Sequence, residues 1–227
     1  MRRKYKLILI ILICGLFTYF IYIFNKDNKL NIVALGDGVA SGETSYNIDG
    51  ISYNDYIKDY FSNKKLLNSY NDNYSKSDYF IKDLIYDIKS NVIDKNNNNY
   101  IKQVLYQADI ITIGFGEEEL VRLSMNNDLN GKILDKIIHE YDNLLFLLNE
   151  LTDSKIIIIS SYENSYLDKS DIIIFNSELS NLAIKHKAIF ININDLLTTG
   201  EYFFDNKKIY FNYKGHQRIA DMIIHSI

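Results

Sequence analysis

The sequence predicts a three-layer α/β/α sandwich around a five-stranded, mostly parallel sheet, preceded by one transmembrane helix. Three observations lead to this prediction. Short apolar runs alternate with helix-like segments along the chain, the runs are apolar at nearly every position, and one long uncharged stretch lies near the N-terminus. Strands that are apolar on both faces are typical of parallel sheets covered by helices on both sides.

The expected strands are short, often β-branched and flanked by turn residues. They are Asn31–Leu35, Lys65–Ser69, Ile110–Ile113, Lys155–Ser160 and Ala188–Ile193. The expected helices lie between them and after the last one. They are Tyr53–Phe61, Asp78–Ser90, Tyr100–Gln107, Glu117–Met125, Ile133–Leu151, Asp171–His186 and Lys214–Ile227. Five such strands favour a flavodoxin-like sheet, which binds ligands beyond the carboxyl ends of its strands.

The loops that follow the strands are therefore where a site is expected. These loops begin after Leu35, Ser69, Ile113, Ser160 and Ile193. The Asn-rich stretch 95–99 is expected to be a loop, and the sequence shows no internal repeat.

The N-terminal stretch Leu7–Phe24 contains 18 residues and no charge, which is enough to cross a hydrocarbon core of about 30 Å. Four basic residues precede it, so the positive-inside rule places the N-terminus in the cytoplasm and the rest outside. A cleaved signal peptide is the alternative, but Tyr22–Asn25 lacks small residues. We expect a cytoplasmic tail (1–6), a membrane anchor (7–24), a linker (25–30) and one domain (31–227).

Charge and composition exclude several functions. Without the four basic residues of 1–24, the chain keeps 21 basic against 29 acidic residues, a net charge of −8, which disfavours nucleic-acid binding. The only cysteine, Cys14, lies in the apolar stretch, so no disulfide or cysteine-based zinc site can form within the chain. A lipoprotein would need small residues before this cysteine, where Ile11–Ile13 stands. No metal and no cofactor are expected.

The first loop, Gly36–Gly42, reads Gly-Asp-Gly-Val-Ala-Ser-Gly. It resembles the G-D-S-x-x-x-G signature of the SGNH, or GDSL, hydrolases. The first glycine, Asp37 and the last glycine match, but Gly38 stands where the family has its nucleophilic serine. Asp37 helps hold this turn in the family, so we expect a structural residue that lines the cleft.

Two further segments resemble blocks of the same family. Gly114–Glu117 looks like G-x-N-D, where the asparagine donates to an oxyanion; Gly116 takes the asparagine position and Glu117 the aspartate position. Lys207–Ala220 looks like the last block, with Tyr210 at the histidine position and Lys207 at the aspartate position. In that block Asn212, Gly215, Ile219 and Ala220 match. The second block, which supplies a glycine amide, falls near Asn73–Ser77.

The resemblance covers most of residues 31–227 and implies an ester-hydrolase scaffold without a Ser-His-Asp triad. Gly38 has no hydroxyl to attack a carbonyl. Tyr210, with an ordinary pKa of about 10 against about 6.5 for histidine, transfers protons poorly near neutral pH. Lys207 has the wrong charge to orient an imidazolium. Loss of a triad nucleophile costs about 10⁶ in rate.

Two residues are further catalytic candidates. Ser41 lies one turn beyond Gly38, although it is more simply explained as a helix residue bonded to the backbone. His216 could be a displaced base, although its position carries no chemistry in the family. The run Glu117–Glu119 either stabilises a helix N-terminus or forms an acidic lip for a cation or amine. The residues expected to line the cleft are Asp37, Gly38, Ser41, Gly116, Glu117 and Tyr210.

These observations predict a membrane-anchored, extracytoplasmic domain that binds an envelope glycan or a partner protein without catalysis. The second hypothesis is an active esterase, acyl hydrolase or acyltransferase on cell-envelope esters that uses rearranged residues. The third is a flavodoxin-like binding domain unrelated to the family. A different sheet order, or a 207–215 loop far from Gly38, would favour the third.

Overall fold

The computed structural model describes residues 15, 29–46, 50–94, 98–194, 199–204 and 206–227. The expected basic tail, the expected anchor except Gly15 and most of the expected linker lie outside these residues. Within the described part of the chain, no helix is both long and apolar enough to cross a membrane.

All five strands pair in parallel in the order β2-β1-β3-β4-β5, which confirms the predicted sheet. The strands are β1 (Leu30–Gly36), β2 (Leu67–Ser75), β3 (Ile110–Gly114), β4 (Lys155–Ile159) and β5 (Ile189–Ile191). The α-helices are α2 (Gly38–Ser41), α3 (Tyr53–Asn63), α4 (Ile81–Ser90), α5 (Ile101–Tyr106), α6 (Glu117–Met125), α7 (Gly131–Leu151), α8 (Lys169–His186) and α9 (Tyr213–Ser226). A short 3₁₀ helix, η1, spans Gly200–Tyr202.

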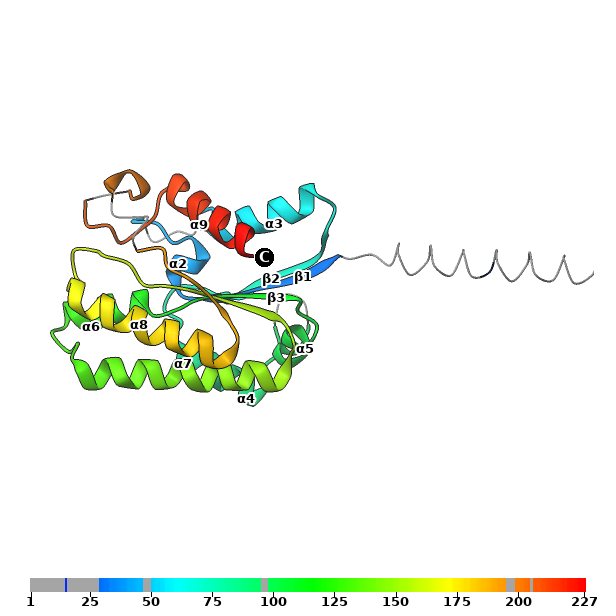
Figure 1. Ribbon diagram of the computed structural model, residues 1–227, viewed down its shortest axis with the longest axis horizontal. Coiled ribbons are helices and arrows are strands. Elements are labelled where there is room, and N and C mark those ends of the chain that lie inside the picture. Colours follow the sequence, from blue (N-terminus) through cyan, green and yellow to red (C-terminus); the bar gives the residue numbers. More distant parts are fainter. Residues whose placement is uncertain (1–14, 16–28, 47–49, 95–97, 195–198, 205) are drawn as a thin grey trace, which may run out of the picture.

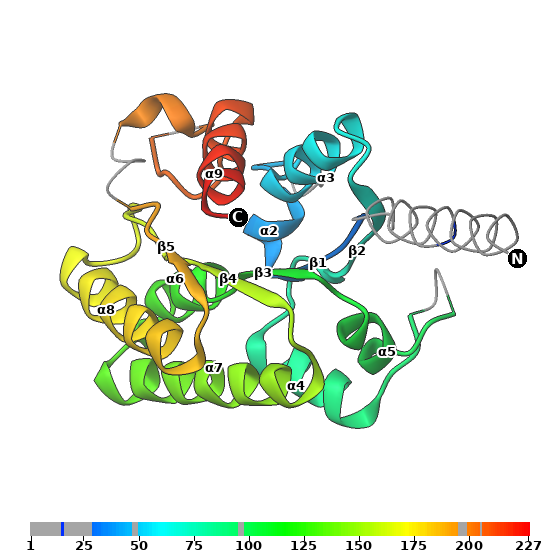
Figure 2. The same cartoon turned by 45° about the vertical axis from the view of Figure 1, so that its right-hand side comes forward.

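Helices cover both faces of the sheet, as expected for strands that are apolar throughout (Figure 1). Helices α3 and α9 lie together on one face, while α4, α7 and α8 form the layer on the other (Figure 2). Successive strand residues enter opposite cores. In β1, Ile32 packs with the α3/α9 layer and Val33 with the α4/α7/α8 layer.

The strand β2 differs from its prediction, because the strand expected at Lys65–Ser69 begins at Leu67 and continues to Ser75. The loop that carries site residues therefore follows Ser75 rather than Ser69. Strand β2 is an edge strand with the sequence Leu-Asn-Ser-Tyr-Asn-Asp-Asn-Tyr-Ser, and only its last two residues are buried. This strand lacks an apolar run and is rich in asparagine and aspartate, which are depleted in strands. Its sequence therefore does not predict a strand over its full length.

The matched residues of the last block have structural roles at the start of α9. The side chain of Asn212 caps the helix by accepting from the amides of Lys214 and Gly215. A Cβ added at Gly215 would lie 2.4 Å from the carbonyl oxygen of Tyr202. Glycine is therefore required for the close approach of α9 to η1.

The sheet order places a switch point between β1 and β3, where the chain leaves the sheet toward opposite faces. The turn after β1 and the turn after β3 meet there, and the amide of Asp37 donates to the carbonyl of Gly114 at 3.0 Å. The loop after β2 joins them, since the amide of Lys76 donates to the carbonyl of Gly36 at 3.2 Å.

Candidate functional site

Asp37 fastens the turn after β1 to the turn after β3. Its buried carboxylate accepts the amides of Val39 at 3.1 Å, Gly116 at 3.1 Å and Glu118 at 3.2 Å. Burial raises the pKa of Asp37 to about 8, and the nearby Glu118 carboxylate adds to the rise, while the amides of Glu118 and Val39 oppose it. Asp37 thus links the two turns beneath the site.

Glu117 fastens the turn after β3 to the loop after β4. Its buried carboxylate accepts the hydroxyl of Ser161, the amide of Tyr162 at 3.3 Å and the side-chain amide of Asn164 at 2.5 Å. Burial raises the pKa of Glu117 to about 7, and the three hydrogen bonds oppose the rise. Both carboxylate oxygens of Glu117 therefore accept hydrogen bonds from the loop after β4.

A small cavity of about 20 Å³ lies among these buried groups and is lined by Asp37, Tyr53 and Glu117, among others. Among the described residues, no hydrogen-bond partner faces the buried hydroxyl of Tyr53. The cavity has the volume of a single water molecule. Asp37 and Glu117 therefore lie beneath the open cleft rather than on its walls.

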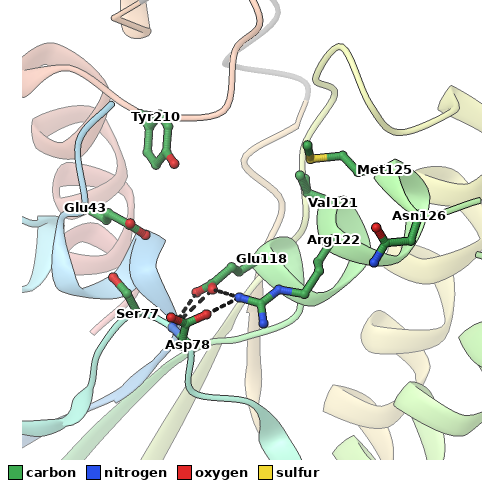
Figure 3. A pocket seen from close by; sticks show the side chains of 9 residues that line it. All are labelled: Glu43, Ser77, Asp78, Glu118, Val121, Arg122, Met125, Asn126 and Tyr210. Carbon is green, nitrogen blue, oxygen red and sulfur yellow. Dashed lines mark hydrogen bonds and ion pairs between the residues drawn. The ribbon is translucent and has the colours of Figure 1, made fainter. Parts of the chain in front are cut away.

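The open pocket has a volume of about 720 Å³ (Figure 3). The residues that line it are Glu43, Ser77, Asp78, Glu118, Val121, Arg122, Met125, Asn126 and Tyr210. They come from the loops after α2 and β2, from α6 and its C-cap residue, and from the segment before α9. Of the residues expected in the cleft, Tyr210 is on this wall.

Glu118 lies at the base of the pocket and receives donors from two separate loops. Its carboxylate accepts the amide of Gly38 at 3.2 Å and the amide of Asp78 at 3.1 Å. The guanidinium of Arg122 donates to the same carboxylate at 2.9 Å and also pairs with the carboxylate of Asp78 (Figure 3). The side chain of Glu118 is only 19% exposed.

Gly38, which the sequence resemblance aligns with the family's serine, lies next to this group and donates its amide to it. A Cβ added there would lie 2.2 Å from a carboxylate oxygen of Glu43 and 3.2 Å from the hydroxyl of Ser77. It would also lie 3.2 Å from a carboxylate oxygen of Glu118. The space above Gly38 is thus occupied by polar atoms of other residues, two of them acidic.

The structure does not pair Ser41 with His216. The hydroxyl of Ser41 donates to the carbonyl of Gly38 at 3.0 Å. Nδ1 of His216 accepts the amide of Tyr53 at 3.2 Å, and its ring stacks on the ring of Tyr53. Burial lowers the pKa of His216 to about 4, so this imidazole is neutral near pH 7. Its contacts place His216 in the packing between α3 and α9.

The remaining substituted positions also have defined surroundings. The ammonium of Lys207 lies 5.8 Å from the ring centroid of Tyr166 rather than at a histidine. Gly116 has a φ of +106°, and a Cβ there would lie 3.0 Å from the ring of Phe175. An asparagine at this position would therefore be strained.

Comparison with known proteins identifies the fold. Neither a protein-family model nor a curated protein sequence matches the chain. Solved structures do match, at 13–16% sequence identity. The lipase Lip_vut3 from a goat rumen metagenome has a TM-score of 0.69 at 15% identity, covering 87% of this chain and 97% of that one. The chain has the SGNH-hydrolase-like fold.

Two further solved structures agree with this assignment. A lipase/acylhydrolase from Enterococcus faecalis has a TM-score of 0.64 at 13% identity, over 86% of this chain and 94% of that one. The acetylxylan esterase Axe2 from Geobacillus stearothermophilus has a TM-score of 0.65 at 14% identity, over 86% and 93%. The strand order β2-β1-β3-β4-β5 is also that of flavodoxin-like domains, so it does not separate them from the esterases. Tyr210 lines the same pocket as Glu118, so the 207–215 segment does not lie far from the turn after β1.

Sequence reasoning did not find Glu43, Ser77, Asp78 or Arg122 as pocket residues. The role of Asp78 is visible only in the structure, where its backbone has a φ of +57°, a conformation that favours glycine. Its amide donates to the carboxylate of Glu118 at 3.1 Å.

Proposed function

We propose that this protein is a membrane-anchored, extracytoplasmic module of the cell envelope whose SGNH-hydrolase-like domain binds a ligand without hydrolysing it. The observation that carries the proposal is the surroundings of Gly38. This position has no hydroxyl, and carboxylates of Glu43 and Glu118 lie where a nucleophile would meet an ester. Negative charges there would also destabilise the oxyanion that forms when an ester carbonyl is attacked.

The pocket itself supports a binding role, because it keeps a volume of about 720 Å³. Its walls combine the Tyr210 ring and the apolar side chains of Val121 and Met125 with charged groups. Aromatic rings beside hydrogen-bonding groups suit a sugar ring, which has apolar faces and polar edges. We therefore place an envelope glycan first and a partner protein second as the ligand.

The second candidate function is an esterase, acyl hydrolase or acyltransferase on envelope esters that uses rearranged residues. The fold favours it, since the solved structures of this fold described above are named as lipases and esterases. The contacts of Ser41 and His216 argue against it, because each side chain bonds to the backbone rather than to the other.

The proposed function is tested with the full chain in detergent and insoluble cell-wall peptidoglycan. We expect the chain to co-sediment with the glycan, and Tyr210→Ala to weaken retention about tenfold, the loss of one aromatic contact of about 1.4 kcal/mol. Tyr86→Ala is the matched control, because Tyr86 is 68% exposed on α4 and is not a pocket residue. No retention, or ester turnover that disappears in Ser41→Ala, would overturn the proposal.

A further inference from the structure

We propose that the amides of Gly38 and Asp78, together with the guanidinium of Arg122, form a carboxylate-binding site that Glu118 occupies as an internal ligand. The inference goes beyond the proposed function, because it assigns a site and its ligand class whether or not the pocket binds a glycan. The class is a planar carboxylate with a short aliphatic group.

The donors of this site come from three separate parts of the chain. The amide of Gly38 lies at the start of the turn after β1, and the amide of Asp78 lies in the loop after β2. Arg122 reaches the same carboxylate from one helical turn further along α6. Three converging donors on one planar group are the usual means of recognising a carboxylate.

The backbone of the site is specialised for this contact. The positive φ of Asp78 turns its amide toward Glu118, where both carboxylate oxygens lie within 3.2 Å of the amide nitrogen. A non-glycine residue in this conformation pays a steric cost, which the hydrogen bonds to Glu118 offset. The contact is thus more than a surface ion pair between Glu118 and Arg122.

The occupied site has a consequence for ligands of the pocket. A carboxylate or a developing oxyanion must displace Glu118 before it can reach the amides of Gly38 and Asp78. In the intact protein these donors are already used, and a second anion beside Glu118 would be repelled. We therefore expect small carboxylates to bind here only when Glu118 is removed.

The test uses Glu118→Ala in the full chain, because this change deletes a CH₂–COO⁻ group that acetate resembles in size and charge. Thermal unfolding is measured in sodium acetate and in sodium chloride at equal ionic strength. We expect acetate to raise the Tm of Glu118→Ala by about 2–4 °C over chloride, through binding to the folded state. The intact protein and Glu178→Ala, an exposed change on α8, are expected to show no such difference.

Neutral acetamide is the ligand control and is expected to give no rise, since it lacks the charge. Equal Tm values for Glu118→Ala in acetate and chloride would overturn the inference. A second measurement tests the inference if Glu118→Ala does not fold. In Glu118→Gln, the amide proton resonances of Gly38 and Asp78 are expected to move upfield as their acceptor loses its charge, and unmoved resonances would overturn the inference.

Discussion

Glu117→Ala is expected to lower the free energy of unfolding by about 3–5 kcal/mol, because it leaves several buried donors without an acceptor. These donors are the hydroxyl of Ser161, the amide of Tyr162 and the side-chain amide of Asn164. Urea denaturation at pH 7 measures the change. Glu178→Ala, at an exposed position on α8, is the control and should stay within about 0.5 kcal/mol.

Glu117 also predicts the sign of a pH dependence. Its pKa in the folded protein is raised from 4.5 to about 7, so the folded state holds this proton more tightly than the unfolded chain does. The free energy of unfolding should therefore fall as pH rises from about 4.5 to about 7. Asp37, with a pKa of about 8, extends the fall to higher pH.

The isosteric change Glu117→Gln separates this effect from simple loss of contacts. It keeps the shape of the side chain but cannot ionise, so the fall in stability between pH 5 and pH 7 should become shallower. Urea denaturation at several pH values in this window measures both slopes. An unchanged slope, or a loss below about 1 kcal/mol in Glu117→Ala, would refute the assignment of Glu117 as a buried anchor.

Restoring the four family residues is expected to leave the protein inactive on short acyl esters. The variant combines Gly38→Ser, Gly116→Asn, Lys207→Asp and Tyr210→His. A serine at position 38 requires the flexible end of Glu43 to move aside, and Glu118 and Ser77 to shift by a few tenths of an ångström. The amides of Gly38 and Asp78, however, stay bonded to Glu118, and the backbone at position 116 strains an asparagine.

Adding Glu118→Ala to these four changes should free the two amides for an oxyanion. Removing one such donor from a working hydrolase costs about 10²–10³ in rate, so we expect kcat/KM of the five-site variant to exceed that of the four-site variant by at least about 10². Hydrolysis of p-nitrophenyl acetate measures both. Equal rates would show that Glu118 does not block the site.

The sequence predicted the fold well wherever burial leaves an apolar run. In β3, Ile110, Ile111 and Ile113 are all buried, and the strand lies within one residue of its expected bounds. Edge strand β2 has no such run, and its extension to Ser75 depends on pairing with β1. The residues of β2 alone therefore could not predict where this strand ends.

The site was less predictable, because its contacts join residues that are far apart in the sequence. Asp37 accepts the amide of Gly116, and Glu118 accepts the amide of Gly38, across about 80 residues in each case. The family resemblance located the turns but did not predict which side chains of other segments lie against them. Glu118 replaces no catalytic residue of the blocks, so only the structure places it against the two amides.

The most direct test of a pocket without a nucleophile is covalent labelling of the full chain with a fluorophosphonate, followed by intact mass spectrometry. A serine esterase of the same fold, labelled in parallel, is the control. We predict no gain in mass, because Gly38 has no hydroxyl and the hydroxyl of Ser41 donates to the carbonyl of Gly38. A stoichiometric adduct on any side chain of the pocket would contradict the proposed function.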